Sequence, residues 1–301
     1  MSYSLCCISN TLKEQGHSFK SMTWKRFGQL SEDSVDDALF ELGSRWLNNV
    51  KVTSLIIQNC AENGWGYRVS SSLFSCLTHP EFGYSVEDVP QYEDIIKEFD
   101  HVASNDAWGV RLSCHPDQFN VLASENESSV EKTINELNYH GWLMDKLGTE
   151  RSYANPINIH VNNSRGDLSS IAARFMSNLE RCDHSVRSRL VVENEDKGCW
   201  NVCNLYHYFY KPYKIPITHD NLHDECNPSP SMYCTMDECA DTWGDFKPLF
   251  HYSESHPDKP NPRSHADMPV GTPDAPKLYD YEIELKGKCY AIRELERLAY
   301  S

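Results

Sequence analysis

The chain has 301 residues, of which 40% are hydrophobic and 24% are charged, the ordinary balance of a globular protein. Its formal net charge of −16 argues against a general basic surface that would hold nucleic acid. No stretch approaches the ~20 apolar residues that span a bilayer, and Met1 to Asn10 lacks the pattern of a signal peptide. We therefore expect a cytoplasmic protein with no membrane partner.

Twelve cysteines are present. In a chain of this length without an export signal, reduced thiols are expected rather than a disulfide framework. No CxxC pair occurs, and Cys199 and Cys203 are four residues apart. A structural zinc site built on cysteines is therefore not expected.

Short β-rich apolar runs alternate with helical patterns along the chain. The predicted strands are Tyr3–Ser9, Tyr67–Ser71, Val110–Cys114, Ile157–Val161, Leu190–Asn194, Ile215–His219, Leu249–Tyr252 and Tyr281–Leu285. The predicted helices are Val35–Asn63, Tyr92–Ala103, Ser129–Leu147, Leu168–Leu179, Asn201–Tyr210, Thr235–Gly244 and Tyr290–Tyr300. This alternation implies parallel pairing with right-handed crossovers, and eight units match one α/β domain, a (β/α)8 TIM barrel over residues 1–301.

An open, doubly wound sheet is the rival architecture. No GxGxxG motif follows the first predicted strand, so a dinucleotide-binding fold and a nucleotide cofactor receive no support. The stretch Ser253–Lys277 is rich in Pro, Asp and Ser and is predicted to be a long loop, which in compact domains is usually functional or disordered.

Side chains able to bind metals follow the predicted strands at their carboxyl ends. They are His79, His115, His160, Glu193, Asp220, His223, His251 and Glu284, with His265 in the long loop. Active sites of TIM barrels lie at that face, so these side chains should converge. A mixture of imidazole and carboxylate suits Zn²⁺ or Mn²⁺ better than Ca²⁺, and nine candidates exceed the needs of one ion, so we expect two or three metals.

Each of these residues also has a plainer interpretation. A single histidine at a strand end is more often a hydrogen-bonded structural residue than a ligand, so the joint pattern carries the argument. Glu193 directly follows Leu-Val-Val, and a carboxylate buried there needs a cation or a paired partner. His219 precedes Asp220 and should point to the opposite face by strand alternation, so we expect it to be structural or to support a ligand.

In these segments the chain resembles the UV damage endonuclease family, a relative of endonuclease IV. The matching segments run in family order across nearly the whole chain. They are Ser9-Asn10, Tyr67–Phe74, Thr78–Pro80, Arg111–Phe119, Glu193–Glu195, Asp220–His223 with Asn227-Pro228, Ser264–Ala266 and Glu284–Lys288. The resemblance implies a TIM barrel with up to three divalent metals, often manganese, with Zn²⁺ or Mg²⁺ as alternatives.

The resemblance also implies roles for the candidate ligands. Glu193 would bridge two metals. The other ligands would divide into His115 and His160 for one metal, Asp220, His251 and Glu284 for another, and His223 and His265 for a third. His79 would line the site, as a ligand or beside one, and the catalytic set would be Glu193, His79 and Asn10.

The implied partner is damaged double-stranded DNA, bound by a monomer. The family inserts a Gln-aromatic pair into the duplex to probe the lesion, and here that pair would be Gln118 and Phe119, where the family often has Tyr. Asn10 would contact the damaged strand. The chain departs from the family at Leu249, where a modified lysine is common and Lys247 is the nearest lysine, and at Cys6, where an aromatic residue is frequent.

The implied reaction is metal-assisted hydrolysis of the phosphodiester immediately 5′ of a distorting lesion such as a pyrimidine dimer, leaving a 3′-hydroxyl. Two other function classes remain open. A metal-dependent sugar isomerase or epimerase on the same barrel would also gather His, Asp and Glu at strand ends, and the acidic net charge favours it slightly. A lesion-binding protein without activity is the third, which Leu249 keeps open.

Overall fold

The computed structural model describes residues 3–105, 109–230, 235–275 and 277–299. Eight parallel strands form one sheet in the order β6-β5-β4-β3-β2-β1-β8-β7. The strands are β1 (Tyr3–Cys6), β2 (Gly66–Val69), β3 (Leu112–Cys114), β4 (Ile157–Ile159), β5 (Leu190–Glu193), β6 (Ile217–Thr218), β7 (Leu249–Tyr252) and β8 (Asp280–Ile283). Each lies within one of the predicted strand ranges or begins one residue before it, and the TIM-barrel prediction is confirmed.

The barrel closes between its two end strands, β6 and β7, through contacts just beyond β6. Asp220 and His251 form a parallel bridge, and the backbone N–H of His251 donates to the carbonyl of His219 at 2.9 Å. The side chain of Asn221 adds a pair of hydrogen bonds to the backbone of Ser253, at 2.9 and 3.0 Å. A few hydrogen bonds, rather than a full ladder, therefore join these two strands.

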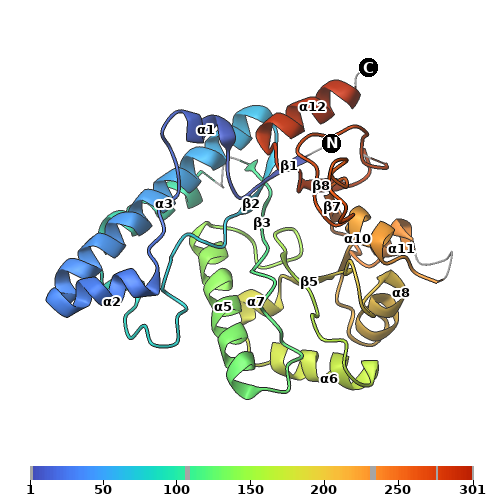
Figure 1. Ribbon diagram of the computed structural model, residues 1–301, viewed down its shortest axis with the longest axis horizontal. Helices are drawn as coiled ribbons and strands as arrows, with labels where there is room; N and C mark the ends of the chain where they lie inside the picture. Colours follow the sequence, from blue (N-terminus) through green and yellow to red (C-terminus); the bar gives the residue numbers. More distant parts are fainter. Residues whose placement is uncertain (1–2, 106–108, 231–234, 276, 300–301) are drawn as a thin grey trace.

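Helices surround the strands, with the long α3 at the left of Figure 1 and the C-terminal α12 near β1 and β8. The helices are α1 (Asn10–Glu14), α2 (Trp24–Asp33), α3 (Val35–Asn63), α4 (Tyr92–Ala103), α5 (Glu127–Lys146), α6 (Leu168–Leu179), α7 (His184–Arg187), α8 (Val202–Leu205), α9 (Lys211–Tyr213), α10 (Asn221–Cys226), α11 (Met236–Asp241) and α12 (Cys289–Ala299). Short helical turns also cover Val86–Asp88 and Tyr206–Tyr210.

Local capping explains where several helices begin. The Ser34 hydroxyl accepts from the N–H of Asp37 and starts α3, which ends at Gly64 in the left-handed region with φ 69°. The prediction of a single helix over Asn201–Tyr210 is only partly right, because α8 passes into a π-helical turn there. The predicted end of the last helix, Tyr300, lies outside the described residues.

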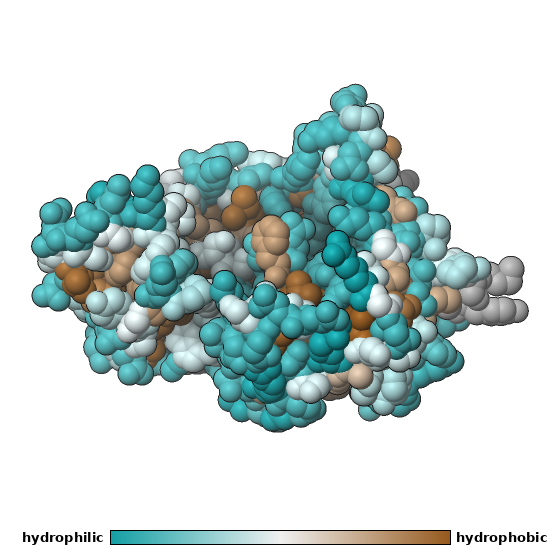
Figure 2. All heavy atoms as spheres, turned by 60° about the horizontal axis from the view of Figure 1, so that its bottom comes forward, coloured by the Kyte–Doolittle hydropathy of each residue, from teal (hydrophilic) through white to brown (hydrophobic). Residues whose placement is uncertain are grey.

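The space between helices and strands is apolar, whereas the inside of the barrel is partly polar. Large side chains such as Trp46, Trp200 and Phe175 are fully buried in the hydrophobic core. Inside the barrel, the polar side chains of Glu282, Ser113 and Asn158 are also buried, at 1%, 2% and 4% exposure. Hydrophilic residues cover most of the face shown in Figure 2, where hydrophobic residues form scattered patches around a hollow.

The cysteines show one departure from expectation. The described cysteines other than Cys203 have free thiols, in line with a reduced protein, but Cys203 is disulfide-bonded, so the expectation of reduced thiols is wrong at this position. Among the described helices, none is long and apolar enough to cross a bilayer.

Candidate metal centre

The carboxylate of Glu193 is the centre of the polar cluster at the carboxyl ends of the strands. It ends β5 and is 1% exposed. Its Oε2 lies 3.1 Å from Nε2 of His115 and 3.2 Å from Nδ1 of His251, and its Oε1 lies 3.0 Å from Nδ1 of His223 and 3.8 Å from Nε2 of His160. Four imidazoles, three from β3, β4 and β7 or their carboxyl ends and one from α10, therefore converge on one carboxylate.

The convergence forms three overlapping groups of possible ligands. Within each group, the nitrogen and oxygen atoms lie no more than 4.8 Å apart. The groups are His115 with Glu193 and His251, His160 with Glu193 and His223, and Asp220 with His251 and Glu284. The structure thus brings together seven of the nine predicted ligands. The group of Asp220, His251 and Glu284 coincides with one set of the division that the family resemblance implies, whereas His115 and His160 fall into separate groups.

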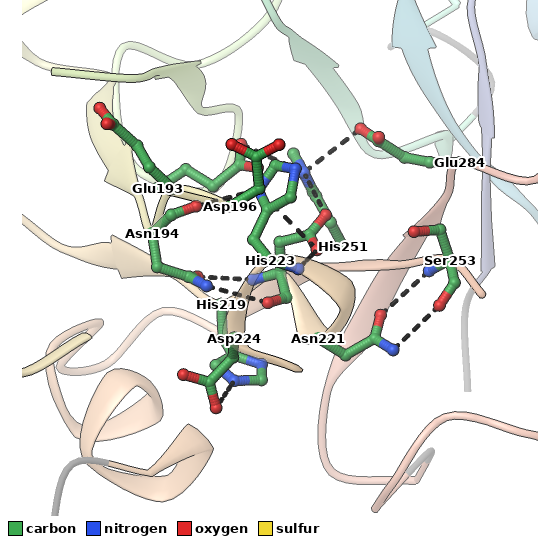
Figure 3. Close-up of polar contacts among 12 residues, drawn as sticks. Glu193, Asn194, Asp196, His219, Asn221, His223, Asp224, His251, Ser253 and Glu284 are labelled. Carbon is green, nitrogen blue, oxygen red and sulfur yellow. Dashed lines mark hydrogen bonds and ion pairs between the residues drawn. The ribbon is translucent and has the colours of Figure 1, made fainter. Parts of the chain in front are cut away.

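Two asparagines hold the strand ends that carry these ligands. The side chain of Asn194 accepts a hydrogen bond from the backbone N–H of Asp220 at 2.8 Å and donates one to the backbone carbonyl of Asp220 at 3.0 Å. These two bonds join the end of β5 to the end of β6. Asn221 makes the same pair of bonds with Ser253 at the end of β7 (Figure 3). Asp220 also caps α10 by accepting from the N–H of His223 at 2.7 Å.

Burial and neighbouring charges set the protonation of this cluster in opposite directions. Burial raises the pKa of Glu193, but the adjacent histidines, His251 foremost, outweigh it and hold the pKa well below its usual value. Burial lowers the pKa of His160 to about 4, which leaves a neutral imidazole at pH 7. Burial also works to lower the pKa of His223, but the charges of Asp220 and Glu193 raise it to about 10.

Two buried atoms lack the hydrogen bonds that buried polar atoms usually make. Asp220 is fully buried, yet its Oδ2 has no hydrogen-bond partner among the described residues. Nδ1 of His251 faces Asp220, Glu193 and Glu284 without a well-aligned hydrogen bond to any of them. Both atoms fit ligation of a divalent cation, and the mixture of imidazole and carboxylate is the donor set that Zn²⁺ and Mn²⁺ accept.

Two predicted ligands stand outside these groups. Nδ1 of His265 lies 3.0 Å from the backbone carbonyl of Glu284 and 3.7 Å from its Oε2, so this histidine flanks the cluster. His79 instead stacks on Trp24, with ring centroids 4.3 Å apart, and its Nδ1 accepts from the N–H of Glu81 at 3.3 Å. The ligand roles of both residues stay predictions.

The predicted DNA-probing pair lies at the tip of a tight turn after β3. Phe119 is 81% exposed, and its N–H donates to the carboxylate of Asp117 at 3.2 Å. The side chain of Asn120 donates to the carbonyl of Asp117 at 2.7 Å, and that of Asn162 donates to the carbonyl of Gln118 at 2.8 Å. These bonds hold the backbone of the turn while leaving the phenyl ring in solvent.

Asn10 and His219 complete the set singled out from the sequence. Asn10 begins α1, which follows β1 after the short connection 7–9, and its side chain donates to the carbonyl of Gly287 at 3.2 Å. His219 lies 3.6 Å from Asp224, away from Glu193, as strand alternation predicts (Figure 3).

Comparisons with known proteins identify the family of this chain. The family model described as UV-endonuclease UvdE matches residues 1–300. The chain belongs to this family. A UV-damage endonuclease of Neurospora crassa is 30% identical over 85% of this chain, and the match covers 42% of the Neurospora protein, less than half its length. A UV DNA damage endonuclease of Bacillus pumilus is 28% identical over 89% of this chain and 82% of its own.

Solved structures support the UvdE fold. The crystal structure of SacUVDE covers 99% of both chains with a TM-score of 0.77 at 24% identity. Endonuclease IV from Thermus thermophilus has a TM-score of 0.54 at 16% identity, covering 82% of this chain and 94% of its own. A 3-keto-D-glucoside 4-epimerase from E. coli has a TM-score of 0.51 at 11% identity, covering 81% of this chain and 93% of its own. These similarities establish the shared barrel.

Several polar residues inside this UvdE barrel escaped the sequence analysis. Nη1 of Arg68 lies 3.0 Å from Oε2 of Glu282 and also contacts Glu284, while the Ser113 hydroxyl donates to Glu282. Asn158 donates to Glu193 from the next strand of the sheet. Strand alternation could have found two of them, because Glu282 shares a face with Glu284, and Asn158 shares one with His160.

Proposed function

We propose that this protein is a metal-dependent endonuclease that cuts UV-damaged DNA at the phosphodiester 5′ of the lesion. The observation that carries the proposal is the convergence of four histidines on the buried Glu193, in a chain of the UvdE family. Two or three divalent ions, with manganese as our first choice, would supply Lewis acidity toward the phosphodiester when bound. The proposed substrate is damaged double-stranded DNA.

The residues of the cluster are suited to hold such ions. Glu193 presents each of its two carboxylate oxygens to a different pair of histidines, so it can bridge two sites. His160 is neutral at pH 7, the state in which imidazole ligates. His223 and His251 carry raised pKa values, so binding of metal at their Nδ1 atoms must release protons.

A small pocket of about 150 Å³ connects this cluster with the turn that carries the aromatic residue. Its walls include Gln118, His160, Lys197 and His223, together with the carboxylates of Glu195 and Asp196. Lys197 contributes a positive charge next to two candidate metal ligands, in a chain whose net charge is −16. A backbone phosphate that entered this pocket would need Lys197 and the bound metal ions to offset the charges of Glu195 and Asp196.

The exposed ring of Phe119 provides a further prediction. Stacking of a base on an aromatic side chain contributes ~1–3 kcal/mol, so Phe119→Ala should weaken binding to a dimer-containing duplex by roughly tenfold to hundredfold. Phe119→Tyr should bind like the wild type. Fluorescence anisotropy with a labelled duplex would measure both. Phe40→Ala is the matched control, because Phe40 is 57% exposed on α3 and lies outside the cluster. Equal affinities for all variants would refute the probing role.

A nicking assay tests the proposal directly. Purified protein with Mn²⁺ would be mixed with an end-labelled duplex carrying one pyrimidine dimer, and separately with the undamaged duplex. We expect a single cut immediately 5′ of the dimer, which a chelator abolishes, and no cut in the undamaged strand. Binding to the dimer without cleavage would favour the lesion-binding alternative. If the protein neither bound nor cut the dimer-containing duplex in the presence of Mn²⁺, the proposal would be refuted. Sugar epimerisation would then be the activity to test.

A further inference from the structure

We propose that Glu282 is a positioning residue of the metal centre, which holds the ring of His251 so that its Nδ1 faces the candidate metal ligands. This inference rests on the proposed function, because it concerns the same centre. Glu282 lies on β8, directly opposite His251 in the register of β7 and β8, and it is 1% exposed. It belongs to none of the three ligand groups.

The contacts of Glu282 use both of its oxygens. Oε2 lies 3.0 Å from Nε2 of His251 and 3.0 Å from Nη1 of Arg68. Oε1 accepts a hydrogen bond from the hydroxyl of Ser113. A carboxylate with these three partners is held in one orientation, and it directs one lone pair at the ring nitrogen of His251 that faces away from Glu193.

The two ring nitrogens of His251 therefore have different surroundings. Nε2 lies 3.0 Å from Glu282, with the side-chain nitrogen of Asn158 farther away at 3.5 Å. Nδ1 lies 3.2 Å from Glu193, 3.3 Å from Glu284 and 3.9 Å from Asp220. In a neutral imidazole one nitrogen carries the proton and the other a lone pair. A proton donated from Nε2 to Glu282 leaves the Nδ1 lone pair toward the three carboxylates, an arrangement that is favourable only with a cation among them.

A carboxylate behind a ligating histidine fixes the tautomer and the ring orientation, and it also makes the other nitrogen a stronger base. Loss of such a partner typically weakens metal affinity ~10–100-fold. Arg68 contributes by holding Glu282 from β2, which is separated from β8 by β1 alone, and the same Nη1 also contacts Glu284. Without the charge of Glu282, this guanidinium would turn fully to Glu284 and compete with a metal for that carboxylate.

The same strand provides an internal comparison. Asp280 points to the same side of β8 as Glu282 and is also buried, at 6% exposure. It pairs with Arg111 at 3.0 Å and with Lys247 at 2.5 Å, and it contacts no residue of the three ligand groups among the described residues. If Glu282 were only half of a buried ion pair, its neutralisation would have the same consequences as that of Asp280.

The experiment compares Glu282→Gln with Asp280→Asn. Calorimetric titration of the metal-free proteins with Mn²⁺ would give the dissociation constants, and thermal unfolding without metal would report the cost in stability. We expect Glu282→Gln to weaken the tightest Mn²⁺ site ~10–100-fold, while Asp280→Asn binds Mn²⁺ like the wild type despite a similar loss of Tm. Equal Mn²⁺ affinities in the two variants would overturn the inference.

A second measurement does not depend on the folding of Glu282→Gln. Long-range ¹H–¹⁵N spectra of the Zn²⁺-loaded wild type would identify the protonated ring nitrogen of His251, assigned by the loss of its signals in His251→Asn. We expect the proton on Nε2, and a proton on Nδ1 would overturn the inference. Failure of the proposed function would look different, since the wild type would then bind Mn²⁺ with the His251 tautomer described here and leave dimer-containing DNA uncut.

Discussion

Replacing Glu193 with glutamine is expected to lower the rate of nicking of a dimer-containing duplex by about 10³-fold or more, a loss at least as large as that of one key charge-stabilising group. The reason is its shared position, because two of the three ligand groups include this carboxylate. An amide offers one weak oxygen donor where the carboxylate offers two charged ones. Single-turnover assays at saturating Mn²⁺ would measure the change.

Metal-induced stabilisation gives an independent measure of the same variant. A ligand that binds only the folded state raises stability in proportion to the logarithm of its concentration above Kd, so Mn²⁺ should raise the Tm of the wild type. The Glu193→Gln protein should show little of this rise. Glu136→Gln is the control, because Glu136 lies on α5 beside His140. Wild-type nicking by Glu193→Gln would exclude a bridging role.

Replacing Arg68 with methionine should destabilise the metal-free protein by about 3–5 kcal/mol, the usual cost of removing one partner from a buried ion pair. The guanidinium of Arg68 contacts both Glu282 and Glu284. Urea unfolding would measure the loss, and Arg297→Met, which removes an exposed partner of Glu294, should cause no measurable change. Mn²⁺ should restore part of the stability of Arg68→Met, because a metal can pair with Glu284.

The effect of Arg68 should depend on pH in a defined direction. Burial raises the pKa of Glu282, but Arg68, His251 and the Ser113 hydroxyl together outweigh it, with Arg68 the largest of the three, and the pKa falls from its ordinary 4.5 to about 2. A folded pKa below the unfolded one means that the stabilisation is fully present above pH 4.5 and disappears as the pH falls through 2. The difference between wild type and Arg68→Met should therefore shrink over that range. A difference that is independent of pH would contradict the ion pair.

The strands were predictable because each is a short apolar run followed by a helical pattern. The ends of the strands were less predictable. The first strand was predicted over Tyr3–Ser9 but ends at Cys6, because Cys7 adopts φ 67°. The helices α1 and α2 were not predicted. α1 is only five residues long, and its start depends on the Ser9 hydroxyl, which accepts from Leu12 N–H at 3.4 Å. A single capping residue is too weak a sequence signal to predict such a short helix.

The convergence on Glu193 was predictable because parallel strands in a closed barrel bring their carboxyl ends to one rim. His79 shows where this reasoning stops. It lies in a turn beyond β2, and its position depends on packing against Trp24, which is 55 positions earlier in the chain and belongs to a helix that was not predicted. The positions of residues in strands or just after them can be predicted from the barrel, but the path of a longer loop cannot.

Asp220, on the seam between β6 and β7, has one further consequence. The ligand group of Asp220, His251 and Glu284 takes its members from the ends of β6, β7 and β8. A cation held there would act as a clasp across the place where the two end strands of the sheet are joined by a single bridge rather than a ladder. Removal of metal would then loosen the wall at this point first, and amide exchange at His251 would report the occupancy of the centre from within the barrel itself.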